Sequence, residues 1–312
     1  MFTQPSMAEA KFQNSGPFFH IHTEPIENDL LIRNEFDAVT LNNLLAVATL
    51  LSGSRLLAFA LMSNHIHLII EGGPDVCETC FEEFKTRLLN HRSRHGGSAG
   101  IKKIKAGYTS INSLRQLRDE IAYVIRNPFV VREDVNPLAY RWCSGYLYFN
   151  PLLDTSGVRL ADLPVRTRRA ILHSRNLPPD HADIFTGLIA NGSEVNPCSF
   201  VDYRRAMEYF DGARNFIMCV FRNIEGQVET ARRLGEQPRL NDSEAMSLTL
   251  KLCRSFFAVN SIRDLTFSQR QQLALKLKNE YSSSNGQIAR CTGLSLSDVN
   301  MMFPMAAKQA KR

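Results

Sequence analysis

The chain has 312 residues, enough for two or three domains, and 44% hydrophobic with 22% charged residues is the composition of a globular protein. This composition excludes collagen-like, coiled-coil and extensively disordered chains. A formal net charge of +6 favours an anionic partner such as nucleic acid. No apolar run reaches the ~20 residues that a membrane-spanning helix needs, so we expect no membrane segment.

The first sixteen residues lack the basic and apolar segments of a secretory signal. We therefore expect a flexible N-terminal tail and a cytoplasmic location. The seven cysteines are scattered along the chain. Only Cys77 and Cys80 form a C-x-x-C pair, and no second pair completes a zinc site, so both are interpreted as ordinary reduced thiols.

The first half of the chain begins with alternating strand and helix patterns. Aromatic and β-branched residues predict a strand over 18–23, and apolar residues at helical spacing predict a helix over 36–51. Two apolar runs then flank the short polar break Ser63–Asn64, which predicts a β-hairpin. The Gly-Gly-Pro sequence over 72–74 is expected to end the second strand of this hairpin.

Two further helices are expected over 80–94 and 111–126, joined by a basic, glycine-containing loop. The second has an apolar stripe at spacings of three and four residues. Pro128 disfavours helical geometry in the preceding residue, so this helix is predicted to end near Asn127, and 129–131 is a candidate last strand. This order predicts an α+β domain with an antiparallel sheet covered by helices.

Strand patterns fade after residue 150, and amphipathic helices are expected to make up an all-α C-terminal region. Its last part, "GQIARCTGLSLSDVNMM", indicates a helix-turn-helix, with Gly293 in the turn and Ser295 or Ser297 as the N-cap of the second helix. The expected divisions of the chain are a flexible tail over 1–16, the α+β domain over 17–150, a helical extension over 151–255 and a helix-turn-helix-like domain over 256–312.

The stretch "MSNHIHLIIEG" places two histidines one residue apart on a predicted strand. Residues i and i+2 of a strand point to the same face, so His65 and His67 project together, as two imidazole ligands of one cation would. The pair by itself is a weak indication, and an ordinary strand face is the commoner explanation of two such histidines. A second such pair, His20 and His22, lies in the first predicted strand. We assign neither as a ligand, and expect one of them to lie beside the site or to contact DNA.

The helix over 111–126 has a polar face on which Tyr123 and Asn127 stand one turn apart. Side chains at this spacing reach the same small volume. The amide oxygen of Asn127 is therefore a candidate third ligand of the cation, and the Tyr123 phenol is a candidate nucleophile towards phosphorus. Asp119 and Glu120 are either proton acceptors for the phenol or solvated carboxylates.

Four segments in this order, "FFHIHTEPIENDLLI", "FALMSNHIHLIIEG", "IAYVIRNP" and "YRWCSGYLYF", resemble the REP-associated tyrosine transposases, single-tyrosine members of the HUH endonuclease superfamily. The resemblance covers roughly residues 18–148. It implies a ferredoxin-like antiparallel sheet with helices and DNA transposition through a 5′-phosphotyrosine. It also implies Tyr123 as the nucleophile, with His65, His67 and Asn127 as ligands of Mg²⁺ or Mn²⁺. The sequence departs from the family pattern at "WCS" and "GIKKIKAGYTSI".

The substrate that the resemblance implies is single-stranded DNA near a hairpin, bound by a monomer or a homodimer. Basic side chains that are expected to follow a phosphate backbone crowd one segment. They are Lys85, Arg87, Arg92, Arg94, Lys102, Lys103 and Lys105. Tyr108 or Trp142 is expected to stack on a base. The alternative interpretation of the segment is an ordinary solvated basic surface.

Two other functions remain open. One is an HUH nickase that serves replication or conjugation, and the other is a non-catalytic regulator that binds DNA through the helix-turn-helix. The short "YVIRNP" segment and the helical region after it favour the transposase over the nickase. The presence of all four candidate site residues argues against the regulator.

Overall fold

The structure is a computed structural model that describes residues 6–26, 30–95, 102, 104–131, 136–173, 184–238 and 240–304. The chain divides into two compact units, Met1–Asn223 and Ile224–Arg312, and each unit has a hydrophobic core of its own. No helix in the described ranges is both long enough and apolar enough to cross a membrane.

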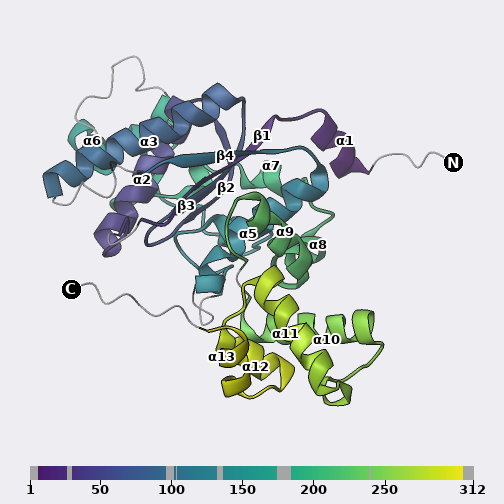
Figure 1. Ribbon diagram of the computed structural model, residues 1–312. Coiled ribbons are helices and arrows are strands. Elements are labelled where there is room, and N and C mark those ends of the chain that lie inside the picture. The colour runs from purple at the N-terminus through teal and green to yellow at the C-terminus, as the bar shows by residue number, and fades with distance from the viewer. Residues whose placement is uncertain are drawn as a thin grey trace, which may run out of the picture. The chain divides into compact units, whose positions relative to one another are not determined.

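The first unit is built on a four-stranded sheet. Its elements are β1 (Phe18–Thr23), α2 (Glu35–Leu51), β2 (Arg55–Leu61), β3 (Ile66–Glu71), α3 (Pro74–His95), β4 (Ala106–Ile111) and α5 (Leu114–Val131). The strand order in space is β2-β3-β1-β4, and every neighbouring pair is antiparallel (Figure 1). The connections through α2 and α3 each pass over one strand, which makes two interleaved β-α-β units. The predicted α+β domain with an antiparallel sheet is confirmed.

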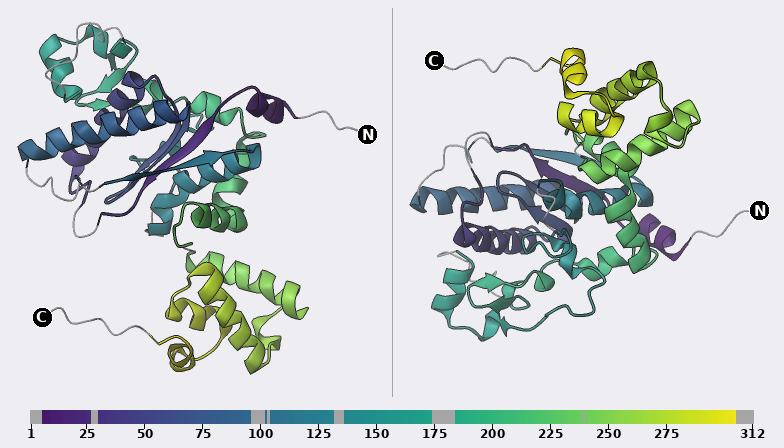
Figure 2. Two further views of the ribbon diagram at one scale, coloured as in Figure 1. Left: turned by 45° about the horizontal axis from the view of Figure 1, so that its top comes forward. Right: turned by 90° about the horizontal axis from the view of Figure 1, so that it is seen from below.

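Alternate side chains divide this sheet into two faces. His22 lies opposite His67 in the register of β1 and β3, so the two histidines share a face. This face is covered by α5, where the ring of Tyr123 lies 5.8 Å from that of His67. On the other face Tyr108 meets Phe81 of α3 edge to face, and α2 lies beside α3. Figure 2 shows α2 and α3 on one side of the sheet and α5 on the other.

Helix α3 begins at Pro74, six residues earlier than the sequence predicts. Proline suits the first turn of a helix, where its missing N–H has no helical partner in any case. Strand β3 ends at Glu71, so the predicted stop at the Gly-Gly-Pro sequence is correct. Cys77 and Cys80 lie inside α3 as buried free thiols, and burial raises the pKa of Cys77 to about 12.

Helix α5 does not end near Asn127 but continues through Pro128 to Val131, so the predicted strand over 129–131 is wrong. Proline removes the N–H that would bond to the carbonyl of residue 124. The buried thiol of Cys143 lies 3.9 Å from that carbonyl oxygen of Val124 and 3.8 Å from the oxygen of Ile125. A weak thiol donor therefore takes the place of the missing amide, and Asn127 stays in regular helical register.

Strand β4 was not predicted from the sequence, which indicated a loop followed by a helix from Ile111. The strand lies at the edge of the sheet and pairs with β1 alone, and its glycine and small polar residues give no strand pattern. Helix α5 begins at Leu114 and not at Ile111. Ser113 caps it, because its hydroxyl accepts a hydrogen bond from the backbone N–H of Gln116 at 3.1 Å.

The other helices of the first unit are α1 (Met7–Gln13), α6 (Val165–Ile171), α7 (Tyr203–Met207) and α8 (Ala213–Arg222). Helix α1 lies within the predicted flexible tail, which is therefore ordered in part. Ala8 is buried, and the ring of Phe12 stacks on that of Phe18 with 5.2 Å between their centroids. These apolar contacts fix the helix against the start of β1.

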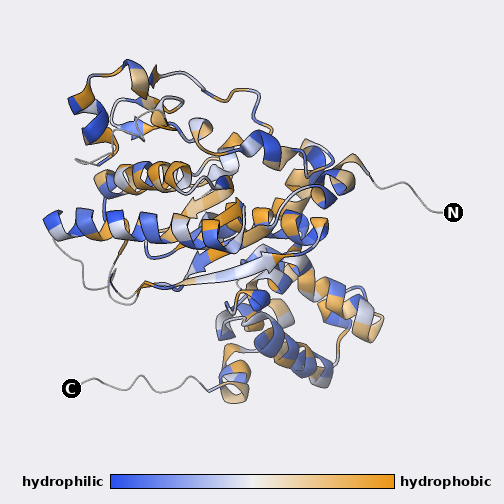
Figure 3. Cartoon of the chain, turned by 90° about the horizontal axis from the view of Figure 1, so that it is seen from above, coloured by the Kyte–Doolittle hydropathy of each residue, from blue (hydrophilic) through white to orange (hydrophobic). Residues whose placement is uncertain are grey.

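A small second sheet in the first unit contradicts the all-α expectation after residue 150. Its antiparallel strands are β5 (Val158–Arg159), β6 (Ile189–Asn191) and β7 (Glu194–Val195), which are too short to leave a periodic pattern. The Asn43 side chain of α2 accepts from the Val195 amide and donates to the Ile171 carbonyl, both at 2.8 Å. Helix α2 is thus buried on several sides, and it is drawn largely in the hydrophobic colour in Figure 3.

The described residues of the second unit form helices joined by loops, with no strand among them. Its helices are α9 (Ile224–Arg233), α10 (Asp242–Phe257), α11 (Phe267–Tyr281), α12 (Asn285–Thr292) and α13 (Leu296–Met302). The predicted border at residue 255 falls inside α10, which packs on α11 and α12. Gly293, at φ +68°, follows α12, and the Ser295 hydroxyl caps α13 by accepting from the Asp298 N–H. Helix, turn and helix therefore lie at the predicted residues.

Candidate active site

Two predicted ligands, His65 and His67, meet at the start of β3. His67 is fully buried in the strand, and His65 is half-buried immediately before it. The Asn127 side chain of α5 joins them. Its Oδ1 lies 3.2 Å from His65 Nε2, and its Nδ2 lies 3.1 Å from His67 Nε2. Two imidazoles and one amide therefore converge on a single point.

Tyr123 lies one helical turn before Asn127 on the same face of α5. The centre of its ring is 5.8 Å from that of His67 and 6.3 Å from that of His20. Its side chain is half-buried, so the phenol lies at the edge of the cluster and not in its interior. The structure thus brings together all four residues that the sequence singles out, and it adds His20.

His20 and Glu120 are part of this cluster. The sequence placed one histidine of the first pair beside the site without saying which, and it did not predict the contact between His20 and Glu120. Both side chains are completely buried. His20 Nδ1 donates to Glu120 Oε2 at 2.5 Å, and His20 Nε2 lies 3.0 Å from His67 Nδ1. Glu120 is not a solvated carboxylate. A buried carboxylate needs a donor, and His20 provides it.

The preceding carboxylate, Asp119, points elsewhere. It is buried, and its Oδ1 accepts a hydrogen bond from Asn223 Nδ2 at 2.6 Å. Consecutive residues of a helix face about 100° apart, so only one of the pair reaches the histidines. Asp119 is therefore not placed to accept a proton from Tyr123.

His22 forms the half-buried rim of the cluster on the side of β4. Its ring is nearly parallel to that of His67, with 6.4 Å between the centroids. It lies against Gly107, its partner in the register of β1 and β4. A Cβ at position 107 would come within 2.5 Å of His22 Cε1, so only glycine permits this ring position.

The donor set fits a hard divalent cation. Burial, together with the neighbouring imidazoles, lowers the pKa of His67 well below its ordinary value, which keeps the ring neutral as a ligand must be. Two imidazoles and an amide oxygen leave open positions on an octahedral ion, as Mg²⁺ or Mn²⁺ bound to phosphate oxygens requires. No group of three or more His, Cys, Asp or Glu among the described residues is placed to hold a metal ion, and the candidate set here consists of two imidazoles and an amide.

The predicted DNA-binding residues do not form one continuous exposed surface. Arg94, Lys102 and Lys105 are exposed, and Lys103 lies outside the described residues. The prediction that Arg92 binds DNA is wrong, because its guanidinium is fully buried and donates to the backbone carbonyl of Leu31 at 2.8 Å. It fixes the segment before α2 and does not face a phosphate.

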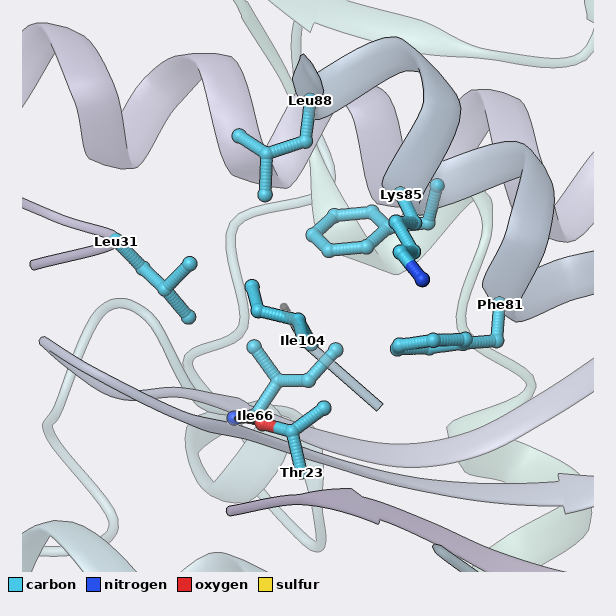
Figure 4. A pocket seen from close by; sticks show the side chains of 8 residues that line it. Thr23, Leu31, Ile66, Phe81, Lys85, Leu88 and Ile104 are labelled. Atoms are coloured by element: carbon cyan, nitrogen blue, oxygen red, sulfur yellow. Dashed lines mark hydrogen bonds between the residues drawn. The ribbon is translucent and has the colours of Figure 1, made fainter. Parts of the chain in front are cut away.

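The two cations at the middle of α3 are partly engaged by the protein. Arg87 Nε donates to Glu83 Oε2 at 3.1 Å. Lys85 lines a small cavity between α3 and the sheet, beside Phe81 and Ile66 (Figure 4). This cavity of about 10 Å³ has the space of one water molecule and admits no larger ligand.

The prediction that Trp142 stacks on a base is also wrong, because its side chain is only 8% exposed. The Arg141 guanidinium lies over the Trp142 ring, 4.7 Å from the ring centroid. The backbone carbonyl of Trp142 accepts a hydrogen bond from the Leu61 amide at 2.8 Å. Ser144 continues this contact by accepting from the Phe59 amide at 3.0 Å. The "YRWCS" segment therefore lies along the outer edge of β2 as part of the structural core.

Neither a protein-family model nor a curated protein matches this chain. Among solved structures, the chain is similar to a REP-associated tyrosine transposase bound to a REP hairpin. The sequence identity is 14% and the TM-score is 0.34, over 43% of this chain and 79% of that one. So distant a similarity establishes no activity, which has to be inferred from the side chains of the site.

Proposed function

We propose that the protein is a metal-dependent DNA endonuclease and strand transferase of the REP-associated tyrosine transposase type, with a ferredoxin-like HUH domain in its first unit. The observation that carries the proposal is the convergence of His65, His67 and Asn127 beside Tyr123. A nucleophile next to a cation site is the arrangement that metal-assisted attack on a phosphodiester requires. The histidines lie at the start of β3 and the other two residues on α5, about sixty residues later in the chain, so their meeting is a property of the fold.

Tyr123 is the proposed nucleophile. Its phenol oxygen attacks phosphorus, the bond from phosphorus to the 3′ oxygen breaks, and a 5′-phosphotyrosine and a free 3′-OH result. The phenol gives up its proton to solvent or a neighbouring base, and the departing oxygen takes one up. Because the phosphodiester is exchanged for another phosphate ester, a later 3′-OH can reverse the step and join two strands.

The remaining residues prepare the site for this step. His65, His67 and Asn127 would hold Mg²⁺ or Mn²⁺, which supplies positive charge to the scissile phosphate and helps a phenol of ordinary pKa near 10 to react. Neutral His67 offers a nitrogen lone pair without repelling the cation. Half-buried Tyr123 is held by α5 within reach of a strand that approaches from solvent.

The proposed substrate is single-stranded DNA that carries hairpins, as the resemblance of residues 18–148 implies. The exposed cations Arg94, Lys102 and Lys105 supply charge for its backbone. The pair α12–α13 is proposed as a helix-turn-helix, although Leu296 is exposed on its second helix where a base-reading helix carries polar side chains. A cytoplasmic location and a monomer or homodimer belong to the same proposal.

The test uses the purified full chain, Mg²⁺ and labelled single-stranded hairpin oligonucleotides from the flanks of its own gene. A denaturing gel should show a covalent protein–DNA band. Chelation of the metal and Tyr123→Phe should each remove the band, since they take away the cation and the nucleophile. Tyr108→Phe is the matched control, because Tyr108 is an exposed tyrosine on the opposite face of the same sheet.

Addition of a second oligonucleotide with a free 3′-OH should release the protein and give a joined strand, which identifies strand transfer. If wild type forms no adduct on any flanking strand, the proposal is wrong. Duplex binding that survives in such an experiment would favour the non-catalytic regulator.

A further inference from the structure

Three buried side chains from different elements form a continuous chain of hydrogen bonds that ends at the proposed cation site. Glu120 of α5 bonds to His20 of β1 at 2.5 Å, and His20 bonds to His67 of β3 at 3.0 Å. The other ring nitrogen of His67 then meets Asn127 at 3.1 Å. The first three side chains are fully buried, and Asn127 is 9% exposed, so bulk water does not compete for these bonds.

The groups at the two ends of this chain, a carboxylate and an amide nitrogen, indicate its donors and acceptors. A carboxylate only accepts hydrogen bonds, so His20 Nδ1 carries the proton that Glu120 receives. At the other end the amide nitrogen of Asn127, a donor, faces His67 Nε2 at 3.1 Å, which matches a neutral His20 whose opposite nitrogen, Nε2, is an acceptor. His67 Nδ1 must therefore be the donor between the two rings. It follows that His67 Nε2 carries a lone pair and is directed at Asn127.

We propose that Glu120 and His20 are positioning residues that hold His67 in the tautomer whose Nε2 lone pair faces the cation site. The role assigned to that lone pair rests on the function proposed above. Metal-binding histidines commonly donate their second N–H to a carboxylate or carbonyl, which fixes ring and tautomer. Here a second imidazole lies between the ligand and the carboxylate.

The geometry of β1 and β3 explains why His20 performs this task and not His22. His22 is directly opposite His67 in the register, but its ring lies nearly parallel to the His67 ring and against Gly107. His20 is opposite Ile69 and reaches His67 diagonally, within the range that long side chains span on one sheet face. The contact to Glu120 from the covering helix holds His20 in this diagonal position.

The first measurement is the tautomer of His67 in the full chain without metal or DNA, from the long-range ¹H–¹⁵N correlations of ¹⁵N-histidine protein. Wild type should show Nδ1 protonated. Glu120→Met, which keeps the approximate volume and removes the acceptor, should redistribute the His67 tautomers. Glu120→Gln retains an oxygen acceptor and should restore the wild-type pattern. Asp119→Asn is the matched control, since Asp119 is the neighbouring buried carboxylate and bonds to Asn223.

The second measurement is Mn²⁺ binding to the same metal-free proteins, followed by electron paramagnetic resonance. Outer partners of ligating histidines are typically worth a factor of about 10–100 in metal affinity. We expect Glu120→Met to weaken Mn²⁺ binding by this factor and Glu120→Gln and Asp119→Asn to leave it nearly unchanged. Thermal unfolding of each variant separates a lost positioning contact from a damaged fold.

The proposal is overturned if His67 of wild type carries its proton on Nε2, or if folded Glu120→Met keeps both the wild-type tautomer and the wild-type Mn²⁺ affinity. Either result is distinct from failure of the proposed function, which would appear as a missing DNA adduct in wild type. The tautomer measurement involves neither DNA nor turnover.

Discussion

At the scale of single residues, the rim of the site depends on the absence of one side chain. His22 occupies the space that a Cβ of Gly107 would need. Gly107→Ala should therefore displace the imidazole or shift β4, and we expect the yield of covalent DNA adduct to fall at least about tenfold, in line with misplacement by roughly 1 Å. The measurement is the denaturing gel described above.

Gly73→Ala is the control for this substitution, because no atom lies within 4 Å of its added Cβ. It should form the adduct at the wild-type rate. A wild-type rate for Gly107→Ala as well would show that the position of His22 is irrelevant to the site.

A second group of histidines, on the other side of the sheet, makes the stability of the fold depend on pH. Burial lowers the pKa of both His91 and His173 to about 4, from an ordinary value of 6.5. Between these values the unfolded chain binds protons that the folded chain does not, so folding stability falls as pH decreases from about 6.5 to 4. Each group contributes at most about 1.4 kcal/mol per pH unit in this window.

Urea unfolding of wild type and His91→Gln at pH 7 and at pH 4.5 tests this dependence. Wild type should lose more stability than the variant on acidification, because only wild type carries the buried imidazole at position 91. Equal losses in the two proteins would contradict the assignment of the pH dependence to His91.

At the scale of secondary-structure elements, the long α5 is the critical one, since it carries Glu120, Tyr123 and Asn127. The Cys143 thiol lies near the Val124 carbonyl, which Pro128 leaves without its usual helical donor. Cys143→Ala should destabilise the protein by about 1–3 kcal/mol, because it leaves a buried acceptor unsatisfied and a small cavity. The loss should be smaller in the Pro128→Ala background, where a backbone N–H is available to Val124.

A double-mutant cycle measured by urea unfolding gives this coupling directly. If the two substitutions are additive within error, the thiol does not substitute for the missing amide. Unchanged unfolding of the single variant Cys143→Ala would exclude the contact altogether.

The elements with strong periodic patterns could be predicted from the sequence, and the others could not. The strand over 18–23 and the hairpin around Ser63 are found where the apolar runs place them. Strand β4 was missed because it is an edge strand of small and polar residues. The end of α5 was misplaced because a proline rule describes local sterics, whereas Cys143, brought in by the fold, compensates for the missing bond.

At the scale of the whole molecule, the two hydrophobic cores predict where the chain can be divided. A protein of residues 1–223 contains the first core entirely and should unfold cooperatively and form the DNA adduct. A protein of residues 1–255, cut at the border predicted from the sequence, retains α10 without the helices that cover its apolar side. It should aggregate more readily than 1–223.

Size-exclusion chromatography and circular dichroism of the two truncated proteins distinguish these outcomes. An unfolded 1–223 beside a folded 1–255 would show that the first unit needs α9 or α10 for its stability.

The arrangement of the whole fold also decides which residues of the site could be predicted from the sequence. His65, His67, Tyr123 and Asn127 stand in short local motifs, so their spacing together with the family resemblance singles them out. The contact between Glu120 and His20 could not be predicted in this way, because it depends on which face of the sheet α5 covers. A rule that carboxylates on a helix are usually solvated then gives the wrong answer for Glu120, which is buried.

The bond between His20 and Glu120 joins positions one hundred residues apart in the chain. Loss of either side chain alone leaves its partner polar, buried and without this bond, at a cost that a marginally stable fold tolerates poorly. The two positions are therefore expected to be inherited together, so that in descendants of this chain a change at one is accompanied by a change at the other. Such paired substitution, and not the local motif around either residue, would be their evolutionary signature.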